Sequence, residues 1–205
     1  RRESIVVYNT LPKEFLFKAE KNKYKLGGVF NVLLICSLKK YKGIQEFIEI
    51  ALKTIEDKNI NYTLILNANK TEIDSFFNKK EISPRIKILP SCNDVSIFYS
   101  NASLLLNLTR VDECVETFGM TILEAMSFGV PVIVPPVGGP SEIVTHGVEG
   151  YCISSYETEV IASKIVELSK DKNLRTRLSK NALKRSKDFS QENFKNKILK
   201  SIVDL

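Results

Sequence analysis

Residues 32–55 have the sequence VLLICSLKKYKGIQEFIEIALKTI, and they contain the unit from which the fold is built. Residues 32–36 form a continuous apolar run of the length of a strand. After Gly43, apolar side chains recur at intervals of three and four residues, as on one face of a helix, and these are Ile44, Phe47, Ile48, Ala51, Leu52 and Ile55. The stretch therefore predicts a strand, a loop and a helix in succession.

The same alternation continues along the chain. Short apolar runs predict further strands at 62–66, 85–89, 103–108 and 130–134. Helical patterns separate these runs, and they carry Ile73, Phe76 and Phe77, then Val95, Phe98 and Tyr99, then Ile122, Leu123 and Met126. Strands that are apolar on both faces and alternate with helices are typical of a parallel sheet covered on both sides. We therefore predict an α/β fold with a doubly wound, Rossmann-like parallel sheet.

The two ends of the chain differ from its centre. Residues 161–205 carry 12 Lys and Arg against five Asp and Glu, so they hold the excess behind the net charge of +6. Their apolar spacing predicts helices whose basic side is a solvated face, with an anionic membrane surface or nucleic acid as alternatives. At the other end, Ile5 to Tyr8 are strand-like and precede a polar, Lys-rich stretch. We expect a connection with a preceding strand at 1–28, a central domain at 29–169 and closing helices at 170–205.

Composition excludes several classes of protein. The chain has 205 residues, of which 43% are hydrophobic and 26% charged, as in globular domains. No apolar run approaches the roughly 18–20 residues of a membrane-spanning helix, and the start lacks the layout of a signal peptide. Without an initiator Met, the chain is expected to begin inside a longer protein. The widely spaced Cys36, Cys92, Cys114 and Cys152 and the single His146 predict buried, reduced thiols and no metal site.

The chemistry is predicted to lie within residues 113–150, ECVETFGMTILEAMSFGVPVIVPPVGGPSEIVTHGVEG. Glu116 stands just before a predicted helix and Glu124 stands inside it. Gly119 and the residues after it fall at the amino end of this helix, where free backbone amides bind anions. An ionised carboxylate beside a phosphate can accept hydrogen bonds from neighbouring hydroxyls. The pattern therefore predicts a site for a phosphorylated ligand that carries a sugar or a ribose.

The stretch resembles the nucleotide-sugar-binding half of retaining glycosyltransferases of family 4, which have the GT-B architecture and a signature of two glutamates separated by seven residues. The resemblance is dense over 116–150 and looser from residue 32 to the terminal helices. It implies a hexosyltransferase-type enzyme that moves a sugar from UDP or GDP to a glycan or lipid-linked acceptor, with retention and without a metal or other cofactor. It also implies that the acceptor-binding N-terminal domain is missing and that this chain is inactive alone.

The resemblance assigns roles to individual residues. Glu116 would contact hydroxyls of the transferred sugar, Lys42 would neutralise the diphosphate leaving group, and Glu124 would hold the ribose. The diphosphate would meet the backbone of Phe118, Gly119, Met120 and Thr121, and the base would lie near Asn69, Pro90 and Ser91. The family commonly has Arg where this chain has Ser37, so a guanidinium that binds the diphosphate is missing. We expect weaker binding of the donor unless Lys39, Lys40 or Arg110 replaces that positive charge. No general base is assigned.

The same residues bear on other functions. A dinucleotide-dependent dehydrogenase needs Gly-x-Gly-x-x-Gly after the first strand, and residues 37–42, SLKKYK, exclude it. A nucleotide-sugar epimerase, a phosphorylase of related fold and a non-catalytic sugar-nucleotide-binding module stay as alternatives. The expected partners are the nucleotide-sugar and, through the missing domain, the acceptor, and no nucleic acid. The expected location is the cytoplasm, with peripheral contact at the inner face of the membrane.

Overall fold

The computed structural model describes residues 6–22, 28–78 and 82–203. Its centre is a six-stranded parallel sheet in the order β3-β2-β1-β4-β5-β6. The strands are β1 (Phe30–Ser37), β2 (Ile60–Asn67), β3 (Ile86–Leu89), β4 (Leu104–Leu106), β5 (Val132–Val134) and β6 (Gly150–Cys152). This is the strand order of doubly wound nucleotide-binding domains, in which the chain reverses direction across the sheet between β1 and β4.

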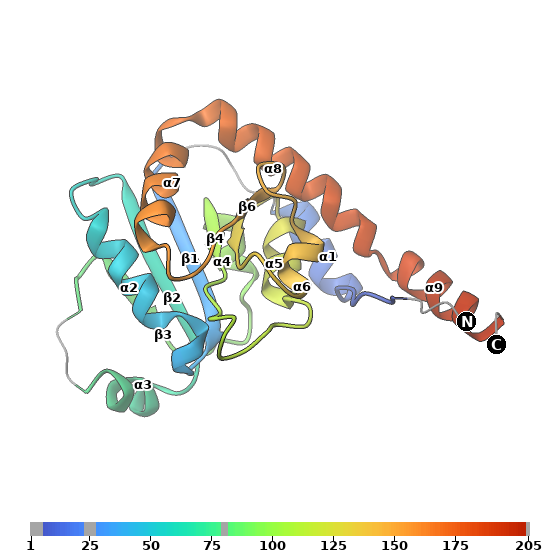
Figure 1. The fold of residues 1–205 in the computed structure, drawn as a ribbon, viewed down its shortest axis with the longest axis horizontal. Coiled ribbons are helices and arrows are strands. Elements are labelled where there is room, and N and C mark those ends of the chain that lie inside the picture. The colour runs from blue at the N-terminus through green and yellow to red at the C-terminus, as the bar shows by residue number, and fades with distance from the viewer. Residues whose placement is uncertain (1–5, 23–27, 79–81, 204–205) are drawn as a thin grey trace.

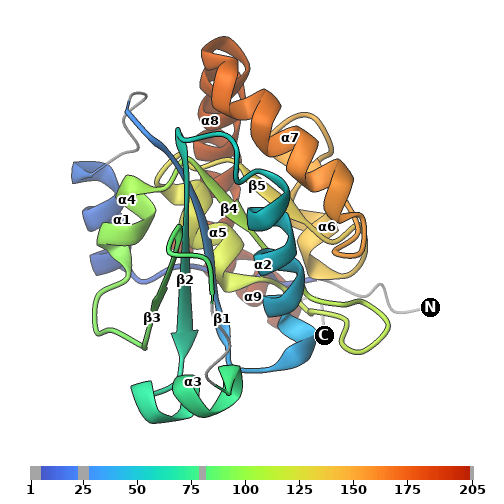
Figure 2. The ribbon, with the colours of Figure 1, turned by 90° about the vertical axis from the view of Figure 1, so that its left-hand side faces the viewer.

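Helices cover both faces of the sheet, as Figure 2 shows, with α2 and α7 on one side and α1 and α4 on the other. Figure 1 shows α9 running outward beyond the rest of the domain. The helices are α1 (Lys13–Lys21), α2 (Ile44–Lys53), α3 (Lys70–Phe77), α4 (Ser96–Asn101), α5 (Met120–Ser127), α6 (Gly139–Ile143), α7 (Thr158–Lys170), α8 (Lys172–Ser186) and α9 (Gln191–Val203). Short 3-10 turns occupy Lys40–Lys42 and Lys187–Phe189.

The apolar runs of the central strands are buried on both faces, whereas β3 at the edge of the sheet is only partly buried. In β1, Val32 and Leu34 contribute to the core beneath α2 and α7, while Leu33 contributes to the core beneath α4 and α5. Alternate side chains of a strand point to opposite faces, so a strand between two helical layers has to be apolar throughout. The predicted doubly wound parallel sheet is confirmed.

The N-terminal segment and the last strand differ from the predictions. The described residues 6–8 form no strand, and the Lys-rich stretch behind them folds into α1. Phe15 of this helix packs edge-on against Tyr99 and Phe128, and these contacts attach the N-terminal connection to the domain. The pattern in α1 is short and half charged, so its apolar stripe was missed. Both β6 and α6 were also missed, because three and five residues are too few for a periodicity to show.

Two further findings concern the cysteines and the membrane. Cys92 is exposed and the other three cysteines are only partly buried, so the prediction of buried thiols is wrong for Cys92 and too strong for the rest. Each is a free thiol. Among the described residues, no helix combines the length and the apolar character needed to cross a bilayer.

Candidate functional site

A cavity of about 350 Å³ opens at the carboxyl ends of β1 and β4, where the strand order reverses. Four segments line it: Asn9 from the N-terminal connection, the end of β1 together with Lys42, residues 107–109 after β4, and residues 116–121 at the start of α5. Ligands of open parallel sheets bind at this point because two neighbouring loops diverge there and leave a crevice. The cavity therefore lies beside the stretch 113–150, in which the sequence predicts the chemistry.

Lys42 and Glu116 meet in this cavity. The Lys42 Nζ lies 3.5 Å from Glu116 Oε1 and 3.4 Å from Thr109 Oγ1. Asn107 Nδ2 donates to Glu116 Oε2 over 2.7 Å, and Thr109 Oγ1 donates to the same oxygen over 3.2 Å. The carboxylate is thus held by neutral donors on one oxygen, while the ammonium lies loosely beside the other. An anion entering the cavity can draw Lys42 without leaving Glu116 unpaired.

A glycine explains how Lys42 reaches this position. Gly43 has φ +77°, and a Cβ placed on it would lie 2.3 Å from both Cβ and O of Leu108. The turn after β1 therefore packs directly on the chain that leaves β4, closer than any side chain would permit. This contact brings Lys42 beside Thr109 and so beside Glu116.

A second glycine supports Glu116 from the other side. The Gly139 N–H donates to the Glu116 carbonyl over 2.8 Å. A Cβ on Gly139 would lie 2.4 Å from Phe118 Cα and from Thr117 O, so this position has no room for a side chain. The loop after β5 therefore fixes the backbone of residues 116–118, and with it the entry into α5.

The amino end of α5 faces the same cavity. Phe118 and Gly119 are buried, and they line the cavity together with Met120 and Thr121. The first backbone amides of a helix have no acceptor within the helix, and the helix dipole places partial positive charge at this end. The arrangement can bind a phosphate with backbone groups alone, and Lys42 adds a full positive charge next to it.

Glu124 lies one turn further into α5. The Tyr99 hydroxyl donates to Glu124 Oε2 over 2.6 Å. Burial raises the pKa of the Glu124 carboxyl above its ordinary value, and the bond from Tyr99 opposes this rise. Thr121 of α5 lines the cavity, whereas Glu124, three residues further along the helix, is not among the residues that line it. The predicted ribose contact at Glu124 stays a prediction.

A second cavity of about 300 Å³ continues from the first, and both are lined by Ile35, Cys36, Ser37 and Thr121. Ser91, Cys92 and Val95 also line it, so the structure brings Ser37 and Ser91 to the same cavity. Asn69 and Pro90 line neither cavity. The Asn69 side chain caps α3 by accepting from the Glu72 N–H over 3.0 Å, which accounts for its polar group locally.

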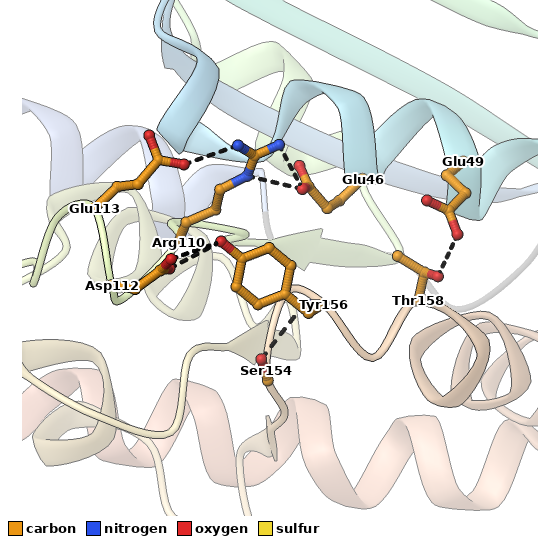
Figure 3. Close-up of polar contacts among 8 residues, drawn as sticks. All are labelled: Glu46, Glu49, Arg110, Asp112, Glu113, Ser154, Tyr156 and Thr158. Atoms are coloured by element: carbon orange, nitrogen blue, oxygen red, sulfur yellow. Dashed lines mark hydrogen bonds and ion pairs between the residues drawn. The ribbon is translucent and has the colours of Figure 1, made fainter.

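Arg110 is engaged elsewhere, as Figure 3 shows. Its Nε and Nη2 lie 2.8 and 2.7 Å from Glu46 Oε1, and its Nη1 lies 2.8 Å from Glu113 Oε1. Both carboxylates raise the pKa of Arg110 further. Arg110 does not line the first cavity, so the structure does not bring it to the position of the guanidinium missing at Ser37. Lys42 is the single Lys or Arg that lines the first cavity among the described residues.

The contacts around Arg110 extend to the loop that precedes α7. The Tyr156 hydroxyl donates to Asp112, with distances of 2.8 and 3.1 Å to its two carboxylate oxygens, and the Arg110 guanidinium lies 5.9 Å from the centre of the Tyr156 ring. Thr158 Oγ1 donates to Glu49 of α2 over 2.6 Å, beside this group in Figure 3. The loop between β4 and α5 is thus fixed to α2 and to the loop that precedes α7.

Three contributors to the site were missed from the sequence. Asn107 and Thr109 hold Glu116, and Asn9 reaches the cavity from the N-terminal connection. Asn107 and Thr109 carry a signal, because both are polar residues at the carboxyl end of an apolar run. Asn9 carries none. No group of three or more His, Cys, Asp or Glu within the described part of the chain is placed to hold a metal ion.

Comparisons with known proteins show the family of the chain. The sequence profile of the family described as "Glycosyl transferases group 1" matches residues 17–185. An uncharacterised glycosyltransferase of Methanocaldococcus jannaschii is 31% identical over 195 residues, which cover 94% of this chain and 51% of that protein. This chain spans about half the length of the curated relatives that match most of it, at 51%, 47% and 44%.

Two solved structures have a similar fold. The structure of HepE from Anabaena, in complex with UDP and glucose, matches with a TM-score of 0.79 and 23% identity over 98% of this chain and 56% of that one. The C-terminal domain of a glycosyl transferase group 1 family protein from Francisella tularensis, LpcC, matches with a TM-score of 0.66 and 22% identity over 91% of this chain and 97% of that domain. The fold is thus like the C-terminal half of GT-B glycosyltransferases, as predicted.

Proposed function

The chain belongs to the glycosyl transferases group 1 family, glycosyltransferase family 4, and from this premise we propose that its cavity binds the nucleotide-sugar donor of a retaining glycosyltransferase. One observation supports the proposal above the others. Lys42 comes from the turn after β1, Glu116 and the amino end of α5 come from residues 116–121, and all of them line one cavity at the switch point of the sheet. A cation, an anion-binding helix end and a hydroxyl acceptor are the groups that a diphosphate joined to a sugar requires.

We propose the following placement of the donor. The diphosphate lies at the amino end of α5 with Lys42 beside it, the sugar lies against Glu116, and the nucleoside extends into the second cavity past Ser37. The structure of the Anabaena relative was determined with UDP and glucose, which supports a nucleoside diphosphate and a sugar as ligands here. In this placement Glu124 holds the ribose hydroxyls once a ligand reaches past Thr121.

The proposed chemistry follows from the charges. When the glycosidic bond to the diphosphate breaks, negative charge builds on the leaving phosphate, and Lys42 together with the helix amides stabilises it. These groups take the place of a divalent cation, so the proposed transfer needs no metal. Glu116, held by Asn107 and Thr109, orients the sugar by accepting from its hydroxyls. The leaving phosphate assists loss of the acceptor proton, so no base is assigned in this chain.

The proposal extends to the whole enzyme. Because the chain spans about half of its relatives, we propose that residues 1–28 connect to an acceptor-binding domain, that 29–169 bind the donor, and that 170–205 close the fold. The transferred hexose then goes to a glycan or lipid-linked acceptor held by the other domain. The isolated chain binds the donor and transfers nothing. When the chain is joined to the acceptor-binding domain, the two-domain enzyme transfers the sugar. A non-catalytic binding module would show no transfer in the same assay.

We propose a cytoplasmic enzyme that touches the inner membrane face through α8. Lys180 and Lys184 of α8 and Lys187 after it are exposed, and such a basic face attracts anionic lipid. Reversing these charges in the two-domain enzyme should reduce its sedimentation with vesicles that contain phosphatidylglycerol. Unchanged sedimentation would remove the membrane part of the proposal and leave the donor site untouched.

Calorimetry without magnesium tests the donor site. UDP or GDP should bind the full 205-residue chain, and Glu124→Ala should weaken that binding at least about tenfold, because each carboxylate hydrogen bond to the ribose is worth about 1.5–3 kcal/mol. Glu56→Ala is the matched control, since Glu56 is exposed and lies outside both cavities. The absence of UDP and GDP binding at millimolar concentration would contradict the proposal.

A further inference from the structure

We propose that Asn9, in the segment before α1, contacts the transferred sugar and helps to select it. The inference rests on the proposed function and adds a specificity residue to it. Asn9 is exposed and lines the same cavity as Lys42 and Glu116, although it lies far from both in the sequence. It is the one described residue of this cavity that comes from the N-terminal connection.

The neighbours of Asn9 hold it in place. The Tyr8 ring lies 6.1 Å from Phe118 and 5.5 Å from Phe189, between centroids, and its hydroxyl donates to Glu142 Oε2 over 2.8 Å. On the other side, Leu11 is 2% exposed and its carbonyl accepts from Gln191 Nε2 over 3.1 Å. An exposed side chain between two anchored neighbours is positioned by the fold in advance, which lowers the entropy cost of contacting a ligand.

The anchors of Tyr8 show which end of the cavity Asn9 faces. Tyr8 reaches Phe118 and Glu142, and Glu142 belongs to α6, whose first residue bonds to the Glu116 carbonyl. Asn9 therefore lies along the segment that carries Glu116. It lines the first cavity and does not appear among the residues that line the second, where Ser91 and Val95 lie. This places Asn9 in the part of the site that holds the sugar and the diphosphate of the proposed donor, away from the nucleoside.

The chemistry of the carboxamide suits a sugar hydroxyl. Asn carries an acceptor oxygen and two N–H donors, so it can both give and receive hydrogen bonds, whereas an ionised Glu116 only receives them. Together the two side chains could distinguish hydroxyls by position and by donor direction. A site built to bond a hydroxyl rejects analogues that lack it, because its polar groups are then left unpaired. We therefore assign Asn9 a role in choosing among sugars and none in binding the nucleotide.

The test compares nucleotide with nucleotide-sugar. Calorimetry measures the Kd of UDP and UDP-glucose, and of GDP and GDP-mannose, for the full chain, for Asn9→Ala and for Asn22→Ala. Asn22 is an exposed Asn at the end of α1 and does not line either cavity, so it is the matched control. Asn9→Ala should weaken the preferred nucleotide-sugar about two- to tenfold, as one lost hydrogen bond does, and leave its nucleoside diphosphate within experimental error. Thermal unfolding without ligand should stay at the wild-type Tm.

Each other outcome counts against the inference in a recognisable way. Equal weakening of nucleotide and nucleotide-sugar would place Asn9 on the phosphates and overturn its assignment to the sugar. No change in either would overturn any ligand contact at Asn9 while the proposed function stands. If the wild-type chain binds none of the four ligands, the proposed function fails, and the inference that rests on it fails with it.

Discussion

Two pairs of opposite charge join the same two segments of the chain, and they are built differently. Arg110 contacts Glu46 through two nitrogens at 2.7 and 2.8 Å, and the Glu46 side chain is only 8% exposed. Lys42 and Glu116 lie 3.5 Å apart, and their side chains are 19% and 21% exposed. The planar, two-pronged guanidinium suits a fixed structural pair, whereas an ammonium on a flexible stem changes partners readily. The difference indicates that Arg110 has a structural role in the fold, whereas Lys42 can change partner and bind a ligand.

The largest expected effect comes from breaking the pair of Arg110 and Glu46. Arg110→Met should lower the free energy of unfolding by about 2 kcal/mol or more, because Glu46 would keep a buried carboxylate without its cation. Arg177→Met is the control, since Arg177 is exposed on α8, and it should change stability by no more than about 0.5 kcal/mol. Urea denaturation of both variants measures this. Equal stability of the two variants would show that the Arg110 pair does not hold the loop.

Removing the Lys42 cation should produce the opposite pattern. Lys42→Met should leave the free energy of unfolding within about 0.5 kcal/mol of the wild type, because partly exposed pairs contribute little. It should weaken UDP or GDP binding about tenfold, since a charged hydrogen bond to the phosphate is lost. Lys39→Met is the matched control, because Lys39 is exposed in the same loop and does not line the cavity. If Lys39→Met weakened binding as much as Lys42→Met, the distinction drawn for Lys42 would be lost.

The smallest expected effect concerns the protonation of Glu124. Its carboxyl has a raised pKa because it is buried, so it takes up a proton at a higher pH than an exposed Glu. As the pH falls through that pKa, the wild-type affinity for nucleotide should fall relative to that of Glu124→Gln, which has no charge to lose there. The ratio of the two affinities removes the titration of the phosphate itself. A ratio that does not change between pH 7 and pH 4 would contradict a role for ionised Glu124 in binding.

Part of this site could be predicted from the sequence. Lys42 follows one buried strand and Glu116 precedes the helix after another, and the carboxyl ends of parallel strands meet at one edge of the sheet. The spacing of Gly119 and Glu124 around a helix start gave the anion site in the same way. Local patterns sufficed here, because each residue is placed by the element next to it.

The partners of these residues could not be predicted, since they depend on distant segments. Arg110 and Glu46 are 64 positions apart, and a loop Arg in a charged sequence indicates neither its partner nor its direction. Asn107 bonds Glu116 because β4 ends at Leu106 and leaves Asn107 in the loop. An apolar run in the sequence does not show at which residue its strand ends. Asn9 reaches the cavity through the packing of Tyr8, which no local pattern indicates.

A crystal structure of the full chain with UDP, or with GDP if it binds more tightly, tests the central claim most directly. The phosphates should lie at the backbone amides of residues 119–121, with the Lys42 ammonium turned from Glu116 to a phosphate oxygen and Arg110 still on Glu46. A nucleotide bound outside the two cavities, or phosphates bound away from α5 with Lys42 still beside Glu116, would contradict the claim that this cavity is the donor site.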